Sequence, residues 1–124
     1  MGDPIRIVLV EDNQVFREAL ELLLGLRSDV EVVASVGDGT EAVPACKAYD
    51  PDVVLMDYRL PGLDGVQATA AVKAACPGTA VVCLTASANA SEMEALLEAG
   101  AVRCLTKDQE LDDIVAAIHE AVGR

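Results

Sequence analysis

Short apolar runs rich in β-branched residues alternate along this chain with longer segments of helical period, and this alternation constrains the fold more than any other feature. It is typical of repeated β-α-β units, which build a parallel sheet. Five strands are expected, at residues 5–10, 31–36, 52–56, 80–84 and 101–105. The first, third and fourth runs are almost continuously apolar, as strands covered on both faces must be. The pattern therefore predicts an α/β fold with helices on both sides of a parallel sheet.

The first three expected helices differ in how clearly the sequence marks them. The first carries an apolar stripe at helical spacing, formed by Phe16, Leu20, Leu23 and Leu24. Asn13 is a suitable N-cap for it. The second contains Pro44, which a helix accommodates only in its first turn or at a distortion. The third, residues 65–75, is mostly alanine, so its boundaries are weakly defined.

The last two expected helices carry end signals. Ser91 and Glu94 have the spacing of a capping box at the start of the fourth helix, and Gly100 should end it. For the last helix Asp108 is the candidate N-cap. This helix has the clearest apolar stripe of the chain, formed by Leu111, Ile114, Val115, Ile118 and Val122.

Length and charge limit the functions that this chain can have. Its 124 residues suffice for one domain, residues 1–124, and are too few for two. The net charge of -12 repels phosphate backbones and anionic membranes, so neither nucleic acid nor a membrane surface is an expected direct partner.

The cysteines and the N-terminus indicate the compartment. Cys46, Cys76, Cys83 and Cys104 form no CxxC pair, and His119 is the only histidine, so a zinc site is not expected. Cys83 and Cys104 fall in strand-like runs and are interpreted as small buried hydrophobic residues in a reducing compartment. The sequence shows neither a signal peptide nor an apolar stretch of about 20 residues, so we expect a cytoplasmic protein.

Polar side chains follow four of the expected strands. Glu11 and Asp12 come after the first strand, Asp57 after the third, Thr85 after the fourth and Lys107 just past the fifth. In open α/β sheets ligands bind beyond the carboxyl ends of the strands. A parallel sheet should therefore bring three carboxylates, a hydroxyl and an ammonium group into one pocket.

Three clustered carboxylates repel one another unless a cation neutralises them. Oxygen ligands of this kind suit Mg²⁺, with Mn²⁺ as an alternative. Lys107 and Thr85 would suit an anion such as a phosphoryl group, and an Asp carboxylate can act as its nucleophile. Each residue alone has a simpler interpretation. Glu11 and Asp12 could be a solvated loop or helix cap, and Asp57 a turn residue. Thr85 could be a strand-end hydroxyl, and Lys107 a surface charge. Their joint placement favours one shared site.

Four segments in this order, VLVEDNQVFREALELLL, DVVLMDYRLPGLDG, LTAS and GAVRCLTKD, resemble the receiver domain of bacterial two-component response regulators. The resemblance covers essentially the whole chain. It implies a flavodoxin-like (βα)5 three-layer sandwich with strand order 2-1-3-4-5. It also implies that a sensor histidine kinase or a small acyl phosphate donates a phosphoryl group.

The resemblance assigns roles to the residues at the strand ends. Asp57 would be the phosphoacceptor, Asp12 a direct Mg²⁺ ligand, and Glu11 a ligand acting largely through water. Thr85 and Lys107 would contact the phosphoryl oxygens. Such a domain is a signalling module that promotes its own phosphorylation and dephosphorylation rather than an enzyme.

Arg59 separates this interpretation from its main competitor. In a receiver its backbone carbonyl would complete the metal shell. A haloacid dehalogenase-like phosphatase also uses an Asp nucleophile and Mg²⁺, but it should carry a second Asp two residues later as general acid. That position is Arg59, and the chain lacks the length for a cap domain.

Within the family, FREALELLL and LTKDQELDDIVAAI resemble the NarL/LuxR-type receivers, which a helix-turn-helix domain usually follows. No such domain is present in these residues. We expect a receiver separated from a transcriptional effector domain, with a stand-alone receiver acting through protein contacts as the alternative. A homodimer is a candidate assembly.

The chain departs from the common receiver pattern at Cys104, where an aromatic residue usually stands. The coupled threonine-aromatic switch therefore cannot operate in its usual form. We expect the loop after Thr85, residues 86–91, to transmit the signal instead.

Overall fold

A computed structural model describes residues 2–86 and 89–124 of the chain. Within them, one sheet holds five parallel strands in the order β2-β1-β3-β4-β5, which confirms the expected topology. The strands are β1 (Ile5–Val10), β2 (Val30–Val36), β3 (Val53–Asp57), β4 (Ala80–Thr85) and β5 (Arg103–Thr106). The observed limits of β2 to β5 differ from the expected ones by one or two residues, as is usual where strands fray into turns.

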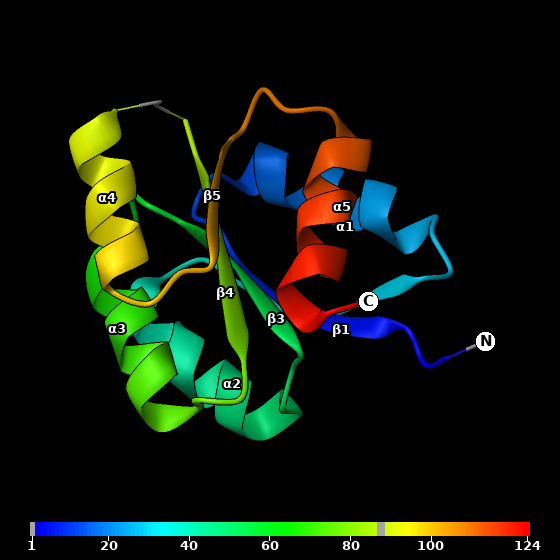
Figure 1. Cartoon of the computed structure of the whole chain (residues 1–124), viewed down its shortest axis with the longest axis horizontal. Coiled ribbons are helices and arrows are strands. Elements are labelled where there is room, and N and C mark those ends of the chain that lie inside the picture. The colour runs from blue at the N-terminus through cyan, green and yellow to red at the C-terminus, as the bar shows by residue number, and fades with distance from the viewer. Residues whose placement is uncertain (1, 87–88) are drawn as a thin grey trace.

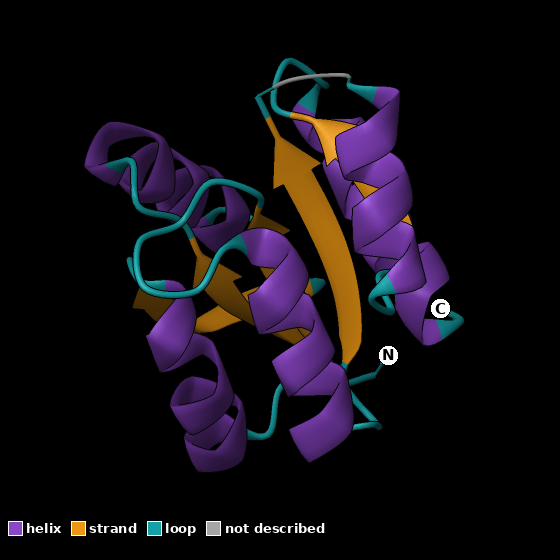
Figure 2. Ribbon diagram, turned by 90° about the vertical axis from the view of Figure 1, so that its left-hand side faces the viewer, coloured by secondary structure: helices purple, strands orange, loops and turns teal. Residues whose placement is uncertain are grey.

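In the described part of the chain, five α-helices cover the two faces of the sheet (Figure 1). They are α1 (Gln14–Gly25), α2 (Ala42–Tyr49), α3 (Gly65–Ala75), α4 (Ala90–Glu98) and α5 (Leu111–Val122), with a short 3-10 helix (Gly39–Glu41) before α2. Helices α1 and α5 lie on one face, and α2, α3 and α4 lie on the other. The view from the side shows the helices flanking the central strands (Figure 2). None of the described helices has the length and apolar composition needed to cross a membrane.

The alternation of side chains along the strands divides the core in two. In β1, Ile7 and Leu9 pack with α1 and α5, whereas Val8 and Val10 pack with the helices of the other face. All five residues of β3 are buried, because this strand is central and covered on both sides. The expectation of nearly continuous apolar strands beneath two helical layers is confirmed.

Several helix starts match their sequence signals. The Asn13 side chain accepts a hydrogen bond from the Phe16 backbone N–H at 3.0 Å, so it caps α1 as expected. Pro44 lies in the first turn of α2, where its missing N–H has no helical partner to lose. A capping box not anticipated from the sequence joins Asp64 and Gln67 at the start of α3.

Two expectations about N-caps are wrong, and one residue of the apolar stripe on α1 lies at the margin of the core. The N-cap of α4 is Asn89, which accepts from the Glu92 N–H at 3.1 Å, so Ser91 lies inside the first turn and forms no capping box. Glu110 precedes α5, while Asp108 instead accepts a hydrogen bond from the Thr106 hydroxyl. On α1, Leu23 is 43% exposed and lies beside the core rather than in it. Gly100 follows the end of α4, as expected.

Candidate functional site

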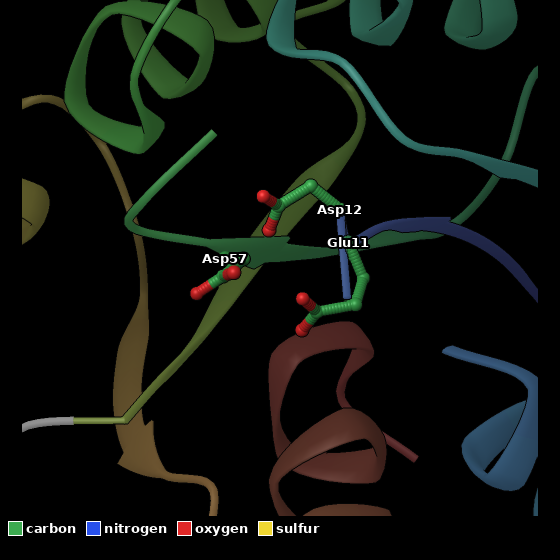
Figure 3. A group of neighbouring side chains, drawn as sticks. All are labelled: Glu11, Asp12 and Asp57. Carbon is green, nitrogen blue, oxygen red and sulfur yellow. The ribbon is translucent and has the colours of Figure 1, made fainter. Parts of the chain in front are cut away.

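Three carboxylates meet where β1 and β3 end, side by side in the middle of the sheet (Figure 3). One oxygen each from Glu11, Asp12 and Asp57 lies within 4.8 Å of the others. Glu11 and Asp57 are almost fully buried, whereas Asp12 is exposed. The predicted acidic cluster is therefore formed, with one open side.

Lys107 supplies the positive charge of the cluster. Its Nζ lies 2.6 Å from Glu11 Oε1 and 3.2 Å from Asp57 Oδ2. Burial by itself would lower the pKa of Lys107, but the contacts with these two carboxylates outweigh it and the pKa is raised. The ammonium group therefore stays charged and compensates part of the clustered negative charge.

Burial and a neighbouring carboxylate both act on the pKa of Glu11. Burial raises its pKa above the usual value, the Asp57 charge acts in the same direction, and hydrogen bonds from Lys107 and the Asn13 backbone N–H oppose both. A buried carboxylate beside another one favours protonation unless a cation lies nearby. A divalent cation at this place would relieve that repulsion.

Asp57 is held by the turn that follows it. The Tyr58 backbone N–H donates to Asp57 Oδ1 at 2.8 Å, and the Gly65 N–H donates to the Tyr58 carbonyl at 2.7 Å. A Cβ atom at Gly65 would lie 2.3 Å from the Asp57 carbonyl oxygen, so this close approach requires glycine. The start of α3 is thereby packed directly against the end of β3.

Thr85 and Lys107 come together through the backbone. The Lys107 N–H donates to the Thr85 carbonyl at 2.8 Å, and Thr85 pairs with Thr106 across β4 and β5. The Thr85 residue is 3% exposed. The hydroxyl-bearing and ammonium-bearing residues thus leave adjacent strand ends next to the acids.

Arg59 lies in the loop after β3, and its side chain contacts α4. Its guanidinium group lies 3.4 Å from Glu92 Oε1 on α4 and stacks over the Tyr58 ring at 5.8 Å. The structure therefore places the residue beside the site, joined by its side chain to the first turn of α4. Ser87, two residues past Thr85, lies outside the described residues.

Two residues of α1 support the site and were not identified from the sequence. Arg17 donates from its guanidinium group to the Glu11 carbonyl at 2.7 Å, and the Phe16 ring lies 4.7 Å from Lys107 Nζ. The sequence signal that could have identified Arg17 is a cationic residue six positions after Glu11, in the first turn of α1. These contacts fix the acid loop and the position of the ammonium group.

The donor set determines what this pocket can hold. The three anionic groups all offer carboxylate oxygens, and neither a thiolate nor an imidazole lies among them. Such a set fits a hard divalent cation rather than a soft one. With Lys107 beside it, the pocket suits a cation together with an oxyanion.

Comparison with known proteins identifies the family. The model of the response regulator receiver domain matches residues 7–119. The chain belongs to the response regulator receiver family. The receiver is 37% identical over 123 residues to the transcriptional regulatory protein NarL of Mycobacterium tuberculosis, covering 98% of this chain and 57% of that protein. It is 37% identical over 114 residues to LnrK of Bacillus subtilis, covering 92% of this chain and 52% of that protein. The receiver therefore spans little more than half the length of these relatives.

Solved structures agree with this assignment. The signal receiver domain of NarL from M. tuberculosis has a TM-score of 0.93 and 37% identity, with 99% of this chain and 100% of that chain covered. A LuxR-family regulator from Aurantimonas has a TM-score of 0.90 and 30% identity, with 97% and 86% covered. The receiver is thus of the NarL/LuxR type, as the sequence predicted. Nothing in these similarities favours the phosphatase alternative.

Proposed function

We propose that this receiver accepts one phosphoryl group on Asp57 and relays its presence to an output. The observation that carries the proposal is the position of Asp57 at the end of β3, within 4.8 Å of two further acids and in contact with Lys107. The phosphoryl donor is the phosphohistidine of a sensor histidine kinase or a small acyl phosphate. The receiver acts in the cytoplasm, where such donors occur.

In the transfer, a carboxylate oxygen of Asp57 bonds to phosphorus while the phosphorus bond to the donor breaks, and the donor leaves with the electron pair. Lys107 and the Thr85 hydroxyl bind the phosphoryl oxygens. Asp12, Asp57, the Arg59 carbonyl and, largely through water, Glu11 would hold Mg²⁺, for which Mn²⁺ could substitute. When bound, the ion neutralises negative charge on the carboxylates and the phosphoryl oxygens.

The receiver should also promote loss of its own phosphoryl group. Arg59, two residues past Asp57, is the proposed determinant of the lifetime of the phosphorylated state. Ser87, two residues past Thr85, is the second candidate position and lies outside the described residues. The salt bridge from Arg59 to Glu92 supports this role for Arg59, because it holds the guanidinium group beside Asp57 without filling the pocket. A water molecule could then approach Asp57 from the open side.

The proposed output is transcription through a C-terminal helix-turn-helix domain, because the relatives are transcriptional regulators nearly twice as long as these 124 residues. The alternative is a stand-alone receiver that acts through protein contacts. In either case residues 1–124 form one domain, and its charge of -12 makes direct DNA contact by this domain unfavourable. A homodimer is a candidate assembly of this receiver.

Intact-mass measurement after incubation with acetyl phosphate and Mg²⁺ tests the proposal. The wild-type receiver should gain the mass of one phosphoryl group, and Asp57→Asn should gain none. Asp113→Asn is the matched control, since Asp113 is exposed on the first turn of α5. Equal labelling of Asp57→Asn and the wild type would exclude Asp57 as the acceptor. Release of phosphate from a chromogenic ester with multiple turnovers would instead indicate a phosphatase.

A further inference from the structure

Two thiols face each other across neighbouring strands beneath the acidic site. Cys83 on β4 and Cys104 on β5 are register partners, so their side chains leave the same face of the sheet. Figure 1 shows the two strands next to each other at one edge of the sheet. Both cysteines are free. Adjacent strands are about 4.8 Å apart, which lies within the Cα separation that a disulfide spans.

The two thiols have different surroundings. Cys83 is fully buried, and its Sγ lies 4.0 Å from the Thr69 hydroxyl. Cys104 is partly exposed, and its Sγ donates to the Met93 carbonyl on α4 at 3.7 Å. One member of the pair is therefore reachable from solvent while the other is enclosed beside it.

The thiols also affect each other's acidity in opposite directions. Interaction with Cys83 lowers the pKa of Cys104, and interaction with Cys104, together with burial, raises the pKa of Cys83. The thiolate is the reactive form of cysteine. Cys104, which is both the more acidic and the more accessible thiol, is the expected site of first attack.

We propose that Cys83 and Cys104 form an oxidisable dithiol, which a hydroperoxide converts into a cross-strand disulfide between β4 and β5. In the first step the Cys104 thiolate takes the terminal oxygen of the hydroperoxide, whose O–O bond breaks to release an alcohol or water after protonation. Cys104 becomes a sulfenic acid. In the second step the Cys83 sulfur displaces that hydroxyl, the S–S bond forms and one water leaves. The dithiol loses two electrons, and the hydroperoxide gains them.

Oxidation of Cys83 and Cys104 would change the contact between β5 and α4. The disulfide removes the S–H that donates to the Met93 carbonyl, so α4 loses a contact to β5. Cys104 also stands where other receivers carry the aromatic residue of their switch, on the side of the sheet covered by α4. Cβ atoms of neighbouring strands lie farther apart than the mean Cβ separation in disulfides, and a strained disulfide is readily reduced. The modification should therefore be reversible by a thiol reductant.

A second pair of cysteines provides an internal comparison. Cys46 and Cys76 line a hollow of about 720 Å³ at the opposite end of the sheet, on α2 and at the end of α3. Burial, with a smaller contribution from Cys76, raises the pKa of Cys46 to about 11. Cys46 should therefore be the poorer nucleophile. Oxidation under mild conditions should reach Cys104 first.

The test treats the full chain with hydrogen peroxide, blocks remaining thiols with N-ethylmaleimide and digests with trypsin. Cleavage after Arg103 places Cys104 in a short peptide of residues 104–107, which should become linked to the peptide of residues 74–103. Because the longer peptide also contains Cys76, the experiment is repeated with Cys76→Ser, which should retain the link. Dithiothreitol should reverse it. Cys104→Ser should form no link, and circular dichroism confirms that it is folded.

Two further measurements separate the outcomes. Asp57→Asn should form the same disulfide, so failure of the phosphoacceptor proposal leaves this one intact. The amide signals of residues 93 and 94 should shift on oxidation and return on reduction. A link between Cys46 and Cys76 without one at Cys104, over-oxidation of Cys104 without a link, or unchanged thiols at peroxide levels that oxidise free cysteine would each overturn the proposal.

Discussion

Lys107 lies closer to Glu11 than to Asp57: its Nζ is 2.6 Å from Glu11 Oε1 and 3.2 Å from Asp57 Oδ2. The ammonium group therefore bridges two buried carboxylates from different strands. In this position it stabilises the acidic cluster of the free protein as well as serving the proposed phosphoryl site. The two roles can be separated experimentally.

Lys107→Ala should destabilise the fold in the absence of metal by about 2 kcal/mol, because it leaves two buried carboxylates uncompensated. Urea denaturation measures this change. Mg²⁺ should restore part of the loss, so the stabilisation by Mg²⁺ should be larger in Lys107→Ala than in the wild type. The same stability in both proteins without metal would show that the contact with Glu11 contributes nothing.

Metal binding should require the acids but not the hydroxyl. Asp12→Ala removes a proposed ligand from the open side of the cluster. It should weaken Mg²⁺ binding by at least about 10-fold, because changing even an outer-shell partner of a metal ligand typically costs about 10- to 100-fold. Thr85→Ala should leave the affinity nearly unchanged while impairing the activated state. Isothermal titration calorimetry measures the Mg²⁺ affinity of both variants. Unchanged affinity in Asp12→Ala would contradict the proposed ligand set.

The acidic cluster should also cost stability when no metal is bound. Asp57→Asn removes one of three neighbouring negative charges and should stabilise the metal-free protein by about 1 kcal/mol. The exposed Asp113→Asn variant is the control. Excess Mg²⁺ should reduce or reverse the difference between Asp57→Asn and the wild type. Thermal unfolding with and without Mg²⁺ gives the comparison, and a destabilised metal-free Asp57→Asn would argue against charge repulsion in the pocket.

Gly65→Ala should disturb both the fold and phosphorylation, because its Cβ would lie 2.3 Å from the Asp57 carbonyl oxygen. We expect a loss of stability of about 1–3 kcal/mol, as for other overpacked positions, and slower labelling by acetyl phosphate. Gly78→Ala is the matched control, since no atom lies within 4 Å of a Cβ built there. Equal behaviour of the two variants would show that the turn after Asp57 tolerates a side chain.

Asp29 should make the stability depend on pH below neutrality. Its carboxylate pairs with Arg27 at 3.0 Å and with His119 at 2.8 Å. Both contacts lower the pKa of Asp29, and the contact with Arg27 has the larger effect. Asp112 also pairs with Arg27, at 3.4 Å. Because the folded pKa is below the unfolded one, the stabilisation is complete above the ordinary Asp value of about 4 and is lost as the pH falls through the folded pKa. The difference in unfolding free energy between wild type and Asp29→Asn should therefore shrink as the medium is acidified from pH 6 towards pH 3. A constant difference would contradict this account.

The sequence by itself determined the layered fold, because strand and helix periods and strand-end polar residues are local properties of the chain. It also identified Glu11, Asp12, Asp57, Thr85 and Lys107 as neighbours, since parallel strands bring their carboxyl ends to one edge. The loop after Thr85 stays a prediction, because Ser87 and Ala88 lie outside the described residues.

Only the tertiary structure decided which partner each of these groups has. Lys107 contacts Glu11 more closely than Asp57, and Arg17 donates to the Glu11 carbonyl. Arg59 pairs with Glu92. These contacts depend on how side chains of different elements pack against one another. The same holds for the Cys83 and Cys104 pair, which only the register of β4 and β5 brings together. Periodicity specifies a face of a strand, but register and helix placement, set by the whole core, specify the neighbour on that face.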